Sequence, residues 1–417
     1  MRRGLVAGLV VLVGCGGQSD RAGRPEAALV AAPTTLVLTD STHSLDALAR
    51  EPMVATHPTG ALFVSGYGDP GPKLWKSGDG GVSWQRVNVG TEADGTVGNS
   101  DVDLAVGPDG TLYFVTMGFN RKTLEGTHVV IGVSHDVGAT WKWTRLSTTR
   151  FDDRPWVEAT PDGTAHVIWN DGRGVRHAVS SDRGVRWSEQ PRINDRGGSS
   201  HLAVGPRGQV AVRIVPMSAS GNKIDQGVEL IAISADGGTT WEKHPAPGER
   251  AWGFPLGNPA DLPRWVEPIA WDDGALYYLW SEGHRLRLGR STDKGASWQA
   301  VTVAEGSAEL YFPYLIARRS GELAASWFSG RGDSLRGNLA RIDWPLGAAA
   351  PLVLRAAPFQ IDSWQALIST ANPAIRDAAG EYLALTFLDD DQIGVVSPIQ
   401  NPRAARFGFS WWRFAAR

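Results

Sequence analysis

Short apolar runs, separated by turns that contain glycine, recur along almost the whole chain. Seven of the turns share one pattern, a glycine followed within two residues by an apolar, β-branched or aromatic run. Their glycines are Gly60, Gly110, Gly163, Gly208, Gly274, Gly321 and Gly380. Such runs between turn residues are typical of β-hairpins, and no stretch keeps a helical period. The pattern therefore predicts an all-β chain built from hairpins.

A polar octapeptide of the form Ser-x-Asp-x-Gly-x-Ser/Thr-Trp accompanies five of these hairpins. It occupies residues 77–84, 134–141, 180–187, 234–241 and 291–298, and only the third copy deviates, with Arg186 at the seventh position. The aspartate can accept hydrogen bonds from nearby backbone N–H groups, the glycine permits a tight turn, and the tryptophan supplies a large apolar body. We interpret ten of these residues as structural: Asp79, Asp136, Asp182, Asp236, Asp293, Trp84, Trp141, Trp187, Trp241 and Trp298. An octapeptide that recurs at such regular intervals along the chain indicates an array of similar units.

The octapeptides resemble Asp-boxes, the repeats of sialidase-like (BNR-repeat) β-propellers, and the resemblance spans most of the chain after residue 35. It implies a β-propeller with four-stranded antiparallel blades, in which the boxes lie away from the active face. Seven hairpins favour seven blades; six blades, as in sialidases, remain the alternative, with one hairpin in an insertion. Leu36–Leu38 and Phe407–Phe414 are candidates for the strand that closes the ring.

The first residues read as an export signal. A basic start and a short apolar run lead to Leu12-Val13-Gly14-Cys15, which resembles a bacterial lipobox and holds the only cysteine of the chain. We expect a lipoprotein signal peptide at 1–14, lipidation of Cys15, a flexible tether at 15–35 and the propeller at 36–417. The protein would then be lipid-anchored to the bacterial cell envelope, at the outer membrane or cell surface because Gly16, not aspartate, follows Cys15.

Composition narrows the choice of partners. The chain is 42% hydrophobic and 20% charged, and its net charge of −3 gives no reason to expect nucleic acid. The nine histidines show no metal-ligand spacing, and no phosphate-cradling loop or serine-nucleophile motif is present. We therefore expect no cofactor and no metal, a monomeric protein, a glycan or protein ligand, and membrane contact only through lipid on Cys15.

Polar residues at the starts of the inner strands are the candidates for chemistry, because propeller ligands bind at the funnel mouth. The resemblance to sialidases implies three arginines for a substrate carboxylate, a tyrosine nucleophile assisted by a glutamate, and an aspartate as acid/base. These roles fall on Arg50, Arg154 and Arg264 for binding, and on Tyr311 or Tyr314, Glu267, and Asp101 or Asp103 for catalysis. Arg50-x-Pro52 keeps only the arginine and proline of the family's motif. In the fourth unit Ser200-His201 stands where the family tends to carry glutamate.

Each candidate also has a structural interpretation. The arginines could pair with Glu51, Asp153 and Glu267, the tyrosines could pack between blades, and His201 could be an interior histidine with satisfied hydrogen bonds. Two function classes therefore stay open. The first is a glycan-binding propeller that hydrolyses its ligand as an exo-sialidase-type glycosidase. The second is a non-catalytic scaffold that recognises protein or glycan.

Overall fold

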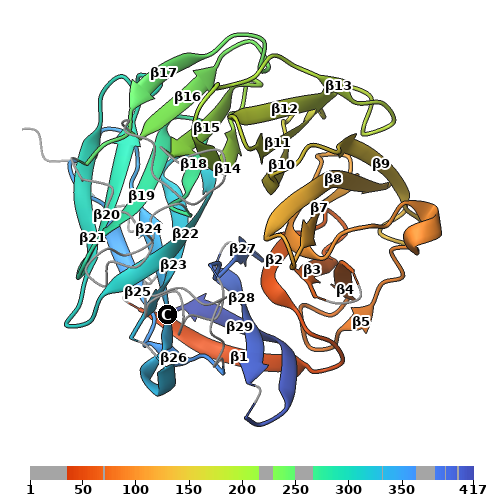
Figure 1. The fold of residues 1–417 in the computed structure, drawn as a ribbon. Coiled ribbons are helices and arrows are strands. Elements are labelled where there is room, and N and C mark those ends of the chain that lie inside the picture. The colour runs from red at the N-terminus through yellow and green to blue at the C-terminus, as the bar shows by residue number, and fades with distance from the viewer. Residues whose placement is uncertain are drawn as a thin grey trace, which may run out of the picture. The chain divides into compact units, whose positions relative to one another are not determined.

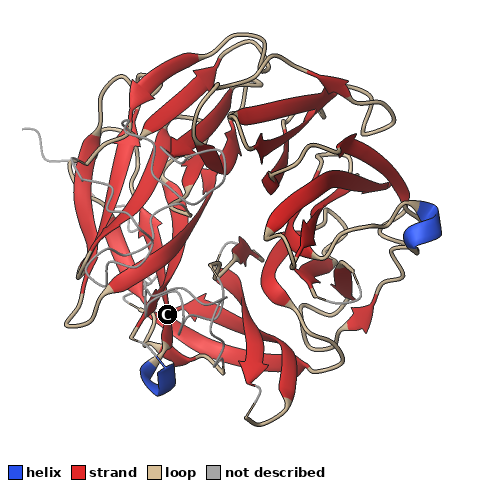
Figure 2. Cartoon of the chain, viewed as in Figure 1, coloured by secondary structure: helices blue, strands red, loops and turns tan. Residues whose placement is uncertain are grey.

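The computed structural model describes residues 35–68, 71–215, 229–248, 266–330, 332–362, 381–389, 391–401 and 403–417. Its strands form seven antiparallel sheets, which Figure 1 shows as a ring of blades. The predicted all-β class and the prediction of seven blades are confirmed, and six blades are excluded. Figure 2 shows that the remainder is loop apart from two 3-10 turns, Glu92–Asp94 and Gly332–Ser334. No helix within the described ranges has the length and apolarity needed to cross a bilayer.

Each of the first six blades runs outward from an inner strand in chain order. Blade 1 holds β2 (Arg50–Thr56), β3 (Leu62–Tyr67), β4 (Lys73–Ser77) and β5 (Gln85–Arg86). Blade 2 holds β6 (Ser100–Val106), β7 (Leu112–Asn120), β8 (Glu125–Ser134) and β9 (Lys142–Ser147). Blade 3 holds β10 (Asp152–Ala159), β11 (Ala165–Asp171), β12 (Val175–Ser180) and β13 (Ser188–Glu189).

The next three blades continue this order. Blade 4 holds β14 (Gly198–Val204), β15 (Val210–Val215), β16 (Leu230–Ser234) and β17 (Glu242–Pro245). Blade 5 holds β18 (Ile269–Trp271), β19 (Leu276–Glu282), β20 (Arg285–Ser291) and β21 (Gln299–Glu305). Blade 6 holds β22 (Leu310–Arg319), β23 (Glu322–Ser329), β24 (Arg336–Asp343) and β25 (Leu352–Arg355), and a short β26 (Phe359–Gln360) also pairs with β24.

Blade 7 closes the ring with strands from both ends of the propeller. From the inside outward it holds β27 (Leu385–Phe387), β28 (Gln392–Asn401), β29 (Arg406–Ala416) and β1 (Leu36–Ser44). Both segments predicted for closure therefore lie in this blade, where Leu36 pairs with Ala416 and Ser44 with Phe409. The seventh glycine turn was expected at Gly380, which lies outside the described residues. The inner strand instead ends at Phe387 and the second begins at Gln392, and in the turn between them Asp389 Oδ1 accepts the N–H groups of Asp391 and Gln392.

The octapeptides form the turns between the third and fourth strands of blades 1 to 5. In blade 2, Asp136 accepts the Thr140 N–H at 2.8 Å and the Thr140 hydroxyl at 2.6 Å. The Ser134 hydroxyl donates to Asp136 at 2.8 Å and accepts the Gly138 N–H at 3.0 Å. These hydrogen bonds, foremost the one from the Thr140 hydroxyl, lower the pKa of Asp136 to about 2.

The box glycines also set how closely neighbouring blades approach. A Cβ on Gly81 would lie 2.0 Å from Trp411 Nε1 of blade 7, and one on Gly238 would lie 2.2 Å from His177 of blade 3. Gly81 and Gly238 have φ angles of 91° and 93°, which L side chains rarely adopt. The glycine therefore serves both the turn and the packing of one blade on the preceding one.

Candidate functional site

The inner strands carry irregular backbone at the end where they begin, which we call the mouth. The pairing of inner and second strands shifts register between Arg50 and Met53 in blade 1, and between Asp153 and Trp156 in blade 3. Similar shifts occur in blades 2, 4 and 6. Such bulges redirect side chains and are frequent near functional sites.

Three residues at these bulges have backbone in the left-handed region. Glu51, Arg154 and Phe312 have φ angles of 46°, 49° and 48°, and each immediately precedes a proline. Left-handed backbone is uncommon for residues other than glycine and costs about 1–3 kcal/mol, so the surrounding structure must hold it in place. The repeated residue-proline pair is thus a sequence signal for the mouth.

Six charged residues gather at the mouth, and we call them the mouth cluster. They are Arg50, Glu51, Asp101, Asp153, Arg154 and Glu381. Arg154 lies 3.6 Å from the Asp153 carboxylate through Nε and 3.4 Å from the Glu381 carboxylate through Nη2. Its guanidinium therefore joins blade 3 to the segment that leads into β27.

Burial and like charges control protonation in the cluster. Glu51 is 4% exposed, and its burial, followed by the charges of Glu381 and Asp101, raises its pKa well above the usual value. Burial also raises the pKa of Asp153 to about 7, although Arg154 opposes the shift. The cluster thus contains carboxyl groups whose pKa values lie above the usual range.

Two tyrosines that sequence reasoning missed adjoin the mouth cluster. Tyr67 interacts electrostatically with Glu51, and the Arg50 guanidinium lies 5.9 Å from the centre of the Tyr67 ring. Tyr382 interacts with Glu381 and Arg154. The sequence repeats pointed to the starts of the inner strands, and neither tyrosine was found there. Tyr67 is the last residue of a second strand, and Tyr382 follows Gly380, where the repeats had predicted the turn into a second strand.

Beyond the mouth cluster, aromatic rings form a layer across the channel. Trp156 and His201 stack with their ring centroids 4.3 Å apart, and Tyr382 meets Trp156 edge-on at 5.4 Å. On the other side, Tyr314 meets His201 edge-on at 5.6 Å. We call these four residues the aromatic layer.

A cavity of about 360 Å³ continues from the aromatic layer along the channel. Residues of all seven inner strands line it, including Thr56, Asp103, Glu158, Ile269 and Thr386. Thr56 and Thr386 contribute from the later parts of β2 and β27, so the cavity lies towards the end of the channel opposite the mouth. We call it the far cavity.

The predicted site residues fall into separate places. Arg50, Arg154 and Asp101 come together in the mouth cluster, whereas Asp103 and Tyr314 line the far cavity. Asp103 accepts the N–H groups of Leu104 and Val157 at 2.8 and 2.9 Å and so links blade 2 to blade 3. The third predicted arginine, Arg264, lies outside the described residues.

Glu267 and Tyr311 take part in packing between and within blades. Glu267 is fully buried, accepts the Tyr278 hydroxyl at 2.7 Å and lies 3.3 Å from Arg213 of blade 4. Tyr311 is also fully buried, and its hydroxyl donates to the Gly330 carbonyl at 2.6 Å. The tyrosine beside Glu267 is therefore Tyr278, which sequence reasoning did not select.

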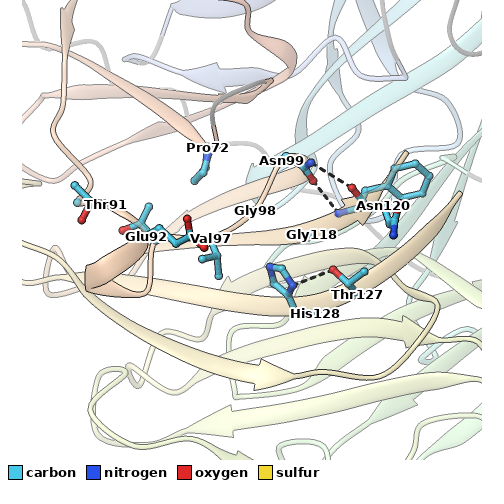
Figure 3. A pocket seen from close by; sticks show the side chains of 14 residues that line it. Pro72, Thr91, Glu92, Val97, Gly98, Asn99, Gly118, Asn120, Thr127 and His128 are labelled. Carbon is cyan, nitrogen blue, oxygen red and sulfur yellow. Dashed lines mark hydrogen bonds between the residues drawn. The ribbon is translucent and has the colours of Figure 1, made fainter. Parts of the chain in front are cut away.

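A second polar pocket of about 480 Å³ lies between blades 1 and 2 (Figure 3). Asn99 holds its edge by accepting the Phe119 N–H at 2.8 Å and donating to the Phe119 carbonyl at 3.2 Å. His128 packs against the wall so closely that a Cβ on Gly118 would lie 2.1 Å from it. The pocket is lined by the residues before β6, the end of β7 and the first part of β8, so it opens at the same end of the blades as the mouth.

The described part of the chain contains no group of three histidine, cysteine, aspartate or glutamate residues arranged to hold a metal ion. The residues of the mouth and of the far cavity can supply hydrogen bonding, ion pairing, stacking and proton transfer by carboxyl groups.

No protein-family model matches the chain, and no curated protein matches it. Among solved structures, a fungal alcohol oxidase of the AA5 family in complex with copper matches with a TM-score of 0.54 at 12% identity, over 91% of this chain and 76% of that one. The endosialidase of phage phi92 matches with a TM-score of 0.50 at 11% identity, over 93% and 70%.

A Hadza microbial sialidase, Hz136, matches with a TM-score of 0.44 at 16% identity; this chain covers 63% of that sialidase's length, and 67% of this chain is matched. At these identities the similarity concerns the fold alone, and the matched proteins carry different activities. The chain has a sialidase-like β-propeller fold with seven blades.

Proposed function

We propose that the protein binds a glycan at the mouth and that carboxyl groups of the mouth cluster hydrolyse a glycosidic bond. One observation carries the proposal: four carboxyl groups and two guanidinium groups from separate blades meet at one end of the channel. Carboxylates and guanidinium groups bind sugar hydroxyls directionally, and such convergence of polar groups is typical of ligand sites.

Glycosidases need one protonated carboxyl group and one carboxylate on either side of the scissile bond. Asp153 is the candidate for the acid, because its pKa is raised towards neutrality while its side chain, 40% exposed, stays within reach of a ligand. Asp101 and Glu381 are the candidates for the second group, since both act electrostatically on Asp153. The sialidase resemblance implied the acid/base role for Asp101 or Asp103, whereas this proposal gives the acid role to Asp153 and makes Asp101 a candidate for the carboxylate.

The charge balance favours a neutral sugar over an anionic one. Arg154 already faces Asp153 and Glu381, so a substrate carboxylate would compete with them for the same guanidinium group. A sialoside remains the ligand that the sialidase resemblance implies, and it therefore belongs in the test beside neutral glycosides.

A glycan array and a panel of fluorogenic glycosides, including a sialoside, test binding and turnover separately. We expect Arg154→Ala to lower glycan binding at least about tenfold and Asp153→Asn to lower turnover at least about a hundredfold with binding retained. Arg285→Ala and Asp273→Asn, at exposed positions in blade 5, are the matched controls. Binding without turnover would leave a glycan-binding propeller, and retention of no glycan would favour a protein ligand and overturn the proposal.

We also propose that the protein is exported and anchored to the cell envelope through lipid on Cys15. The lipobox-like Leu12–Cys15 and the absence of any other cysteine support this proposal. Labelling cells with a radioactive fatty acid should mark the protein, and Cys15→Ser should abolish the label. A label that persists in Cys15→Ser would refute the anchor.

A further inference from the structure

The far cavity contains two carboxyl groups with no cationic partner. Neither Asp103 nor Glu158 forms an ion pair with any lysine or arginine of the described residues. Burial raises the pKa of Asp103 to about 7, and burial together with Asp103 raises that of Glu158 to about 8. Val54, Ile269 and Leu385 line the same cavity together with polar side chains such as Thr56 and Thr386, and two neighbouring carboxyl groups there favour a cation, because its charge would stabilise their ionised forms.

A second observation that indicates a ligand concerns buried ring nitrogens of the aromatic layer that lack hydrogen-bond partners. His201 is 5% exposed, lines the far cavity, and has no hydrogen-bond partner at either ring nitrogen. Trp156 is 4% exposed, and its indole N–H is also unpartnered. Buried polar groups in proteins are nearly always hydrogen-bonded, and none of the described residues supplies a partner for these three nitrogen atoms. Among the described residues, His201 therefore lacks the hydrogen bonds that a satisfied interior histidine would have.

The two observations concern one space. Tyr314 meets His201 edge-on, and its pKa is raised by burial and by the nearby carboxyl groups of Asp103 and Glu158. The ring of Tyr314 therefore spans the distance between the acids and the unpartnered histidine. A ligand in the far cavity would meet carboxyl groups on one side and aromatic rings on the other.

We propose that the far cavity binds a small organic amine with a neighbouring hydroxyl group, the chemistry shared by amino alcohols and amino sugars. The ammonium group would lie between Asp103 and Glu158, with the Tyr314 ring beside it. The hydroxyl group would accept the Trp156 N–H and donate to a ring nitrogen of His201. Burial and the positive charges of Arg213 and Arg154 lower the pKa of His201 well below its usual value, so the neutral ring offers one acceptor nitrogen.

This site is distinct from the mouth cluster and does not rest on the proposed glycan binding there. The charged residues of the mouth do not line the far cavity, whereas Trp156, His201 and Tyr314 of the aromatic layer do. Arg318 lines its outer part, but its guanidinium is paired with Glu322 and donates to the Asp389 carbonyl. Half-buried residues such as Thr56, Val106 and Phe387 form the same outer part, so the cavity has a route to solvent.

Calorimetric titration of the full chain with ethanolamine and with glucosamine tests the proposal. We expect saturable binding of one or both amines. The amine that binds with the higher affinity shows whether the natural ligand is an amino alcohol or an amino sugar. Glucose and N-acetylglucosamine lack the charge and should bind at least about tenfold more weakly than glucosamine. Equal binding of the neutral and the charged sugars, or no saturable binding of either amine, would overturn the proposal.

Substitutions of the lining residues test whether the amine binds in the far cavity. Glu158→Gln should lower amine affinity at least about tenfold, whereas Glu305→Gln, on the exposed outer strand of blade 5, should leave it unchanged. His201→Phe offers a second variant that keeps the ring stack, and it should also weaken binding. Unchanged affinity in both Glu158→Gln and His201→Phe would contradict the assignment.

Ethanolamine binding at neutral pH should also release protons, because its ammonium group favours the ionised form of both acids. The titratable or charged residues that line the cavity are Asp103, Glu158, His201, Tyr314 and Arg318, and the lining residues of β2, β18 and β27 carry none. Titration in buffers with different ionisation enthalpies measures this release. Release that is the same in Glu158→Gln as in the unaltered protein would count against the site.

Discussion

At the scale of single residues, the first serine of the octapeptide holds the turn together by hydrogen bonds. The Ser134 hydroxyl is buried, donates to Asp136 and accepts the N–H of Gly138. Trp141 closes the same turn from the other side by donating its indole N–H to the Gly138 carbonyl at 3.1 Å. The turn is thus held by a hydroxyl group, a carboxylate and an indole together.

Replacing Ser134 with alanine should lower the free energy of unfolding by about 1–2 kcal/mol, because the buried Gly138 N–H loses its partner. Urea denaturation at neutral pH measures the change. Arg186→Thr is the matched substitution in the deviating box: the Arg186 backbone and side chain both donate to Asp182 at 2.8 Å, so a threonine should replace those contacts with little change. A destabilisation by Arg186→Thr as large as that by Ser134→Ala would contradict this account.

Gly81 shows a residue whose second role the sequence could not reveal. Its positive φ was predictable from the turn, but its contact with Trp411 joins the first box to a strand more than three hundred residues later. Local patterns report local conformation, and packing between blades depends on which blades are neighbours. The same limit explains why Tyr278 was missed as the partner of Glu267.

Gly81→Ala should lower the free energy of unfolding by roughly 2–4 kcal/mol, because a Cβ combines left-handed strain with overlap on Trp411. Gly60→Ala has a similar φ of 85° but no atom within 4 Å of the added Cβ, so it should show the strain alone. Thermal denaturation of the two variants separates the two effects. Equal losses would mean that the contact with Trp411 contributes nothing.

At the scale of strands and blades, the hairpins and boxes were predictable because each is encoded within about ten residues. Blade 7 was harder to predict. The strand that follows Gly380 is its inner strand and not its second strand, and the turn between these two strands contains Asp389, so the glycine pattern was offset by one strand. The candidate mouth was only partly predictable: Arg50, Asp101 and Arg154 could be selected, whereas Glu381 and Tyr382 depend on that offset strand.

Blade 3 contains a buried histidine pair that should make the protein sensitive to acid. His166 Nδ1 and His177 Nε2 lie 3.1 Å apart on adjacent strands, and both rings are fully buried. Burial lowers the pKa of His166 to about 4 and that of His177 to about 3. The folded blade therefore keeps both rings neutral at a pH where unfolded histidines are charged.

As the pH falls from about 6.5 to 4, the unfolded state should bind protons that the folded state does not, so this pair should lower stability by roughly 3 kcal/mol per histidine. Raised carboxyl pKa values such as that of Glu158 act in the opposite direction. The difference between the unaltered protein and His166→Leu/His177→Leu isolates the histidines. We expect urea denaturation to give a flatter pH dependence for the double variant, and parallel curves would refute the assignment.

At the scale of the whole propeller, stability depends on a closure between the two ends of the domain. β1 completes blade 7 by pairing with β29, and Thr35 exchanges backbone hydrogen bonds with Arg417 at 3.1 and 3.0 Å. The Thr42 hydroxyl also donates to the Gly81 carbonyl at 2.6 Å, which connects β1 to the first box of blade 1. Closure therefore joins three parts of the chain that are distant in sequence.

Removing residues 1–44 should expose the edge of β29, whereas removing residues 1–34 leaves β1 in place. We expect the longer truncation to lower Tm by at least about 5 °C relative to the shorter one and to promote aggregation through the free edge. Thr42→Pro in the full chain tests the same point without truncation, because proline fits poorly within a strand and lacks the hydroxyl group that donates to the Gly81 carbonyl. Calorimetry with light scattering measures both effects.

Since each blade packs mainly on its neighbours, an opened ring should also unfold less cooperatively. If the two truncated proteins and Thr42→Pro all melted at one temperature, β1 would be an accessory strand, and the ring would be held by contacts between blades alone.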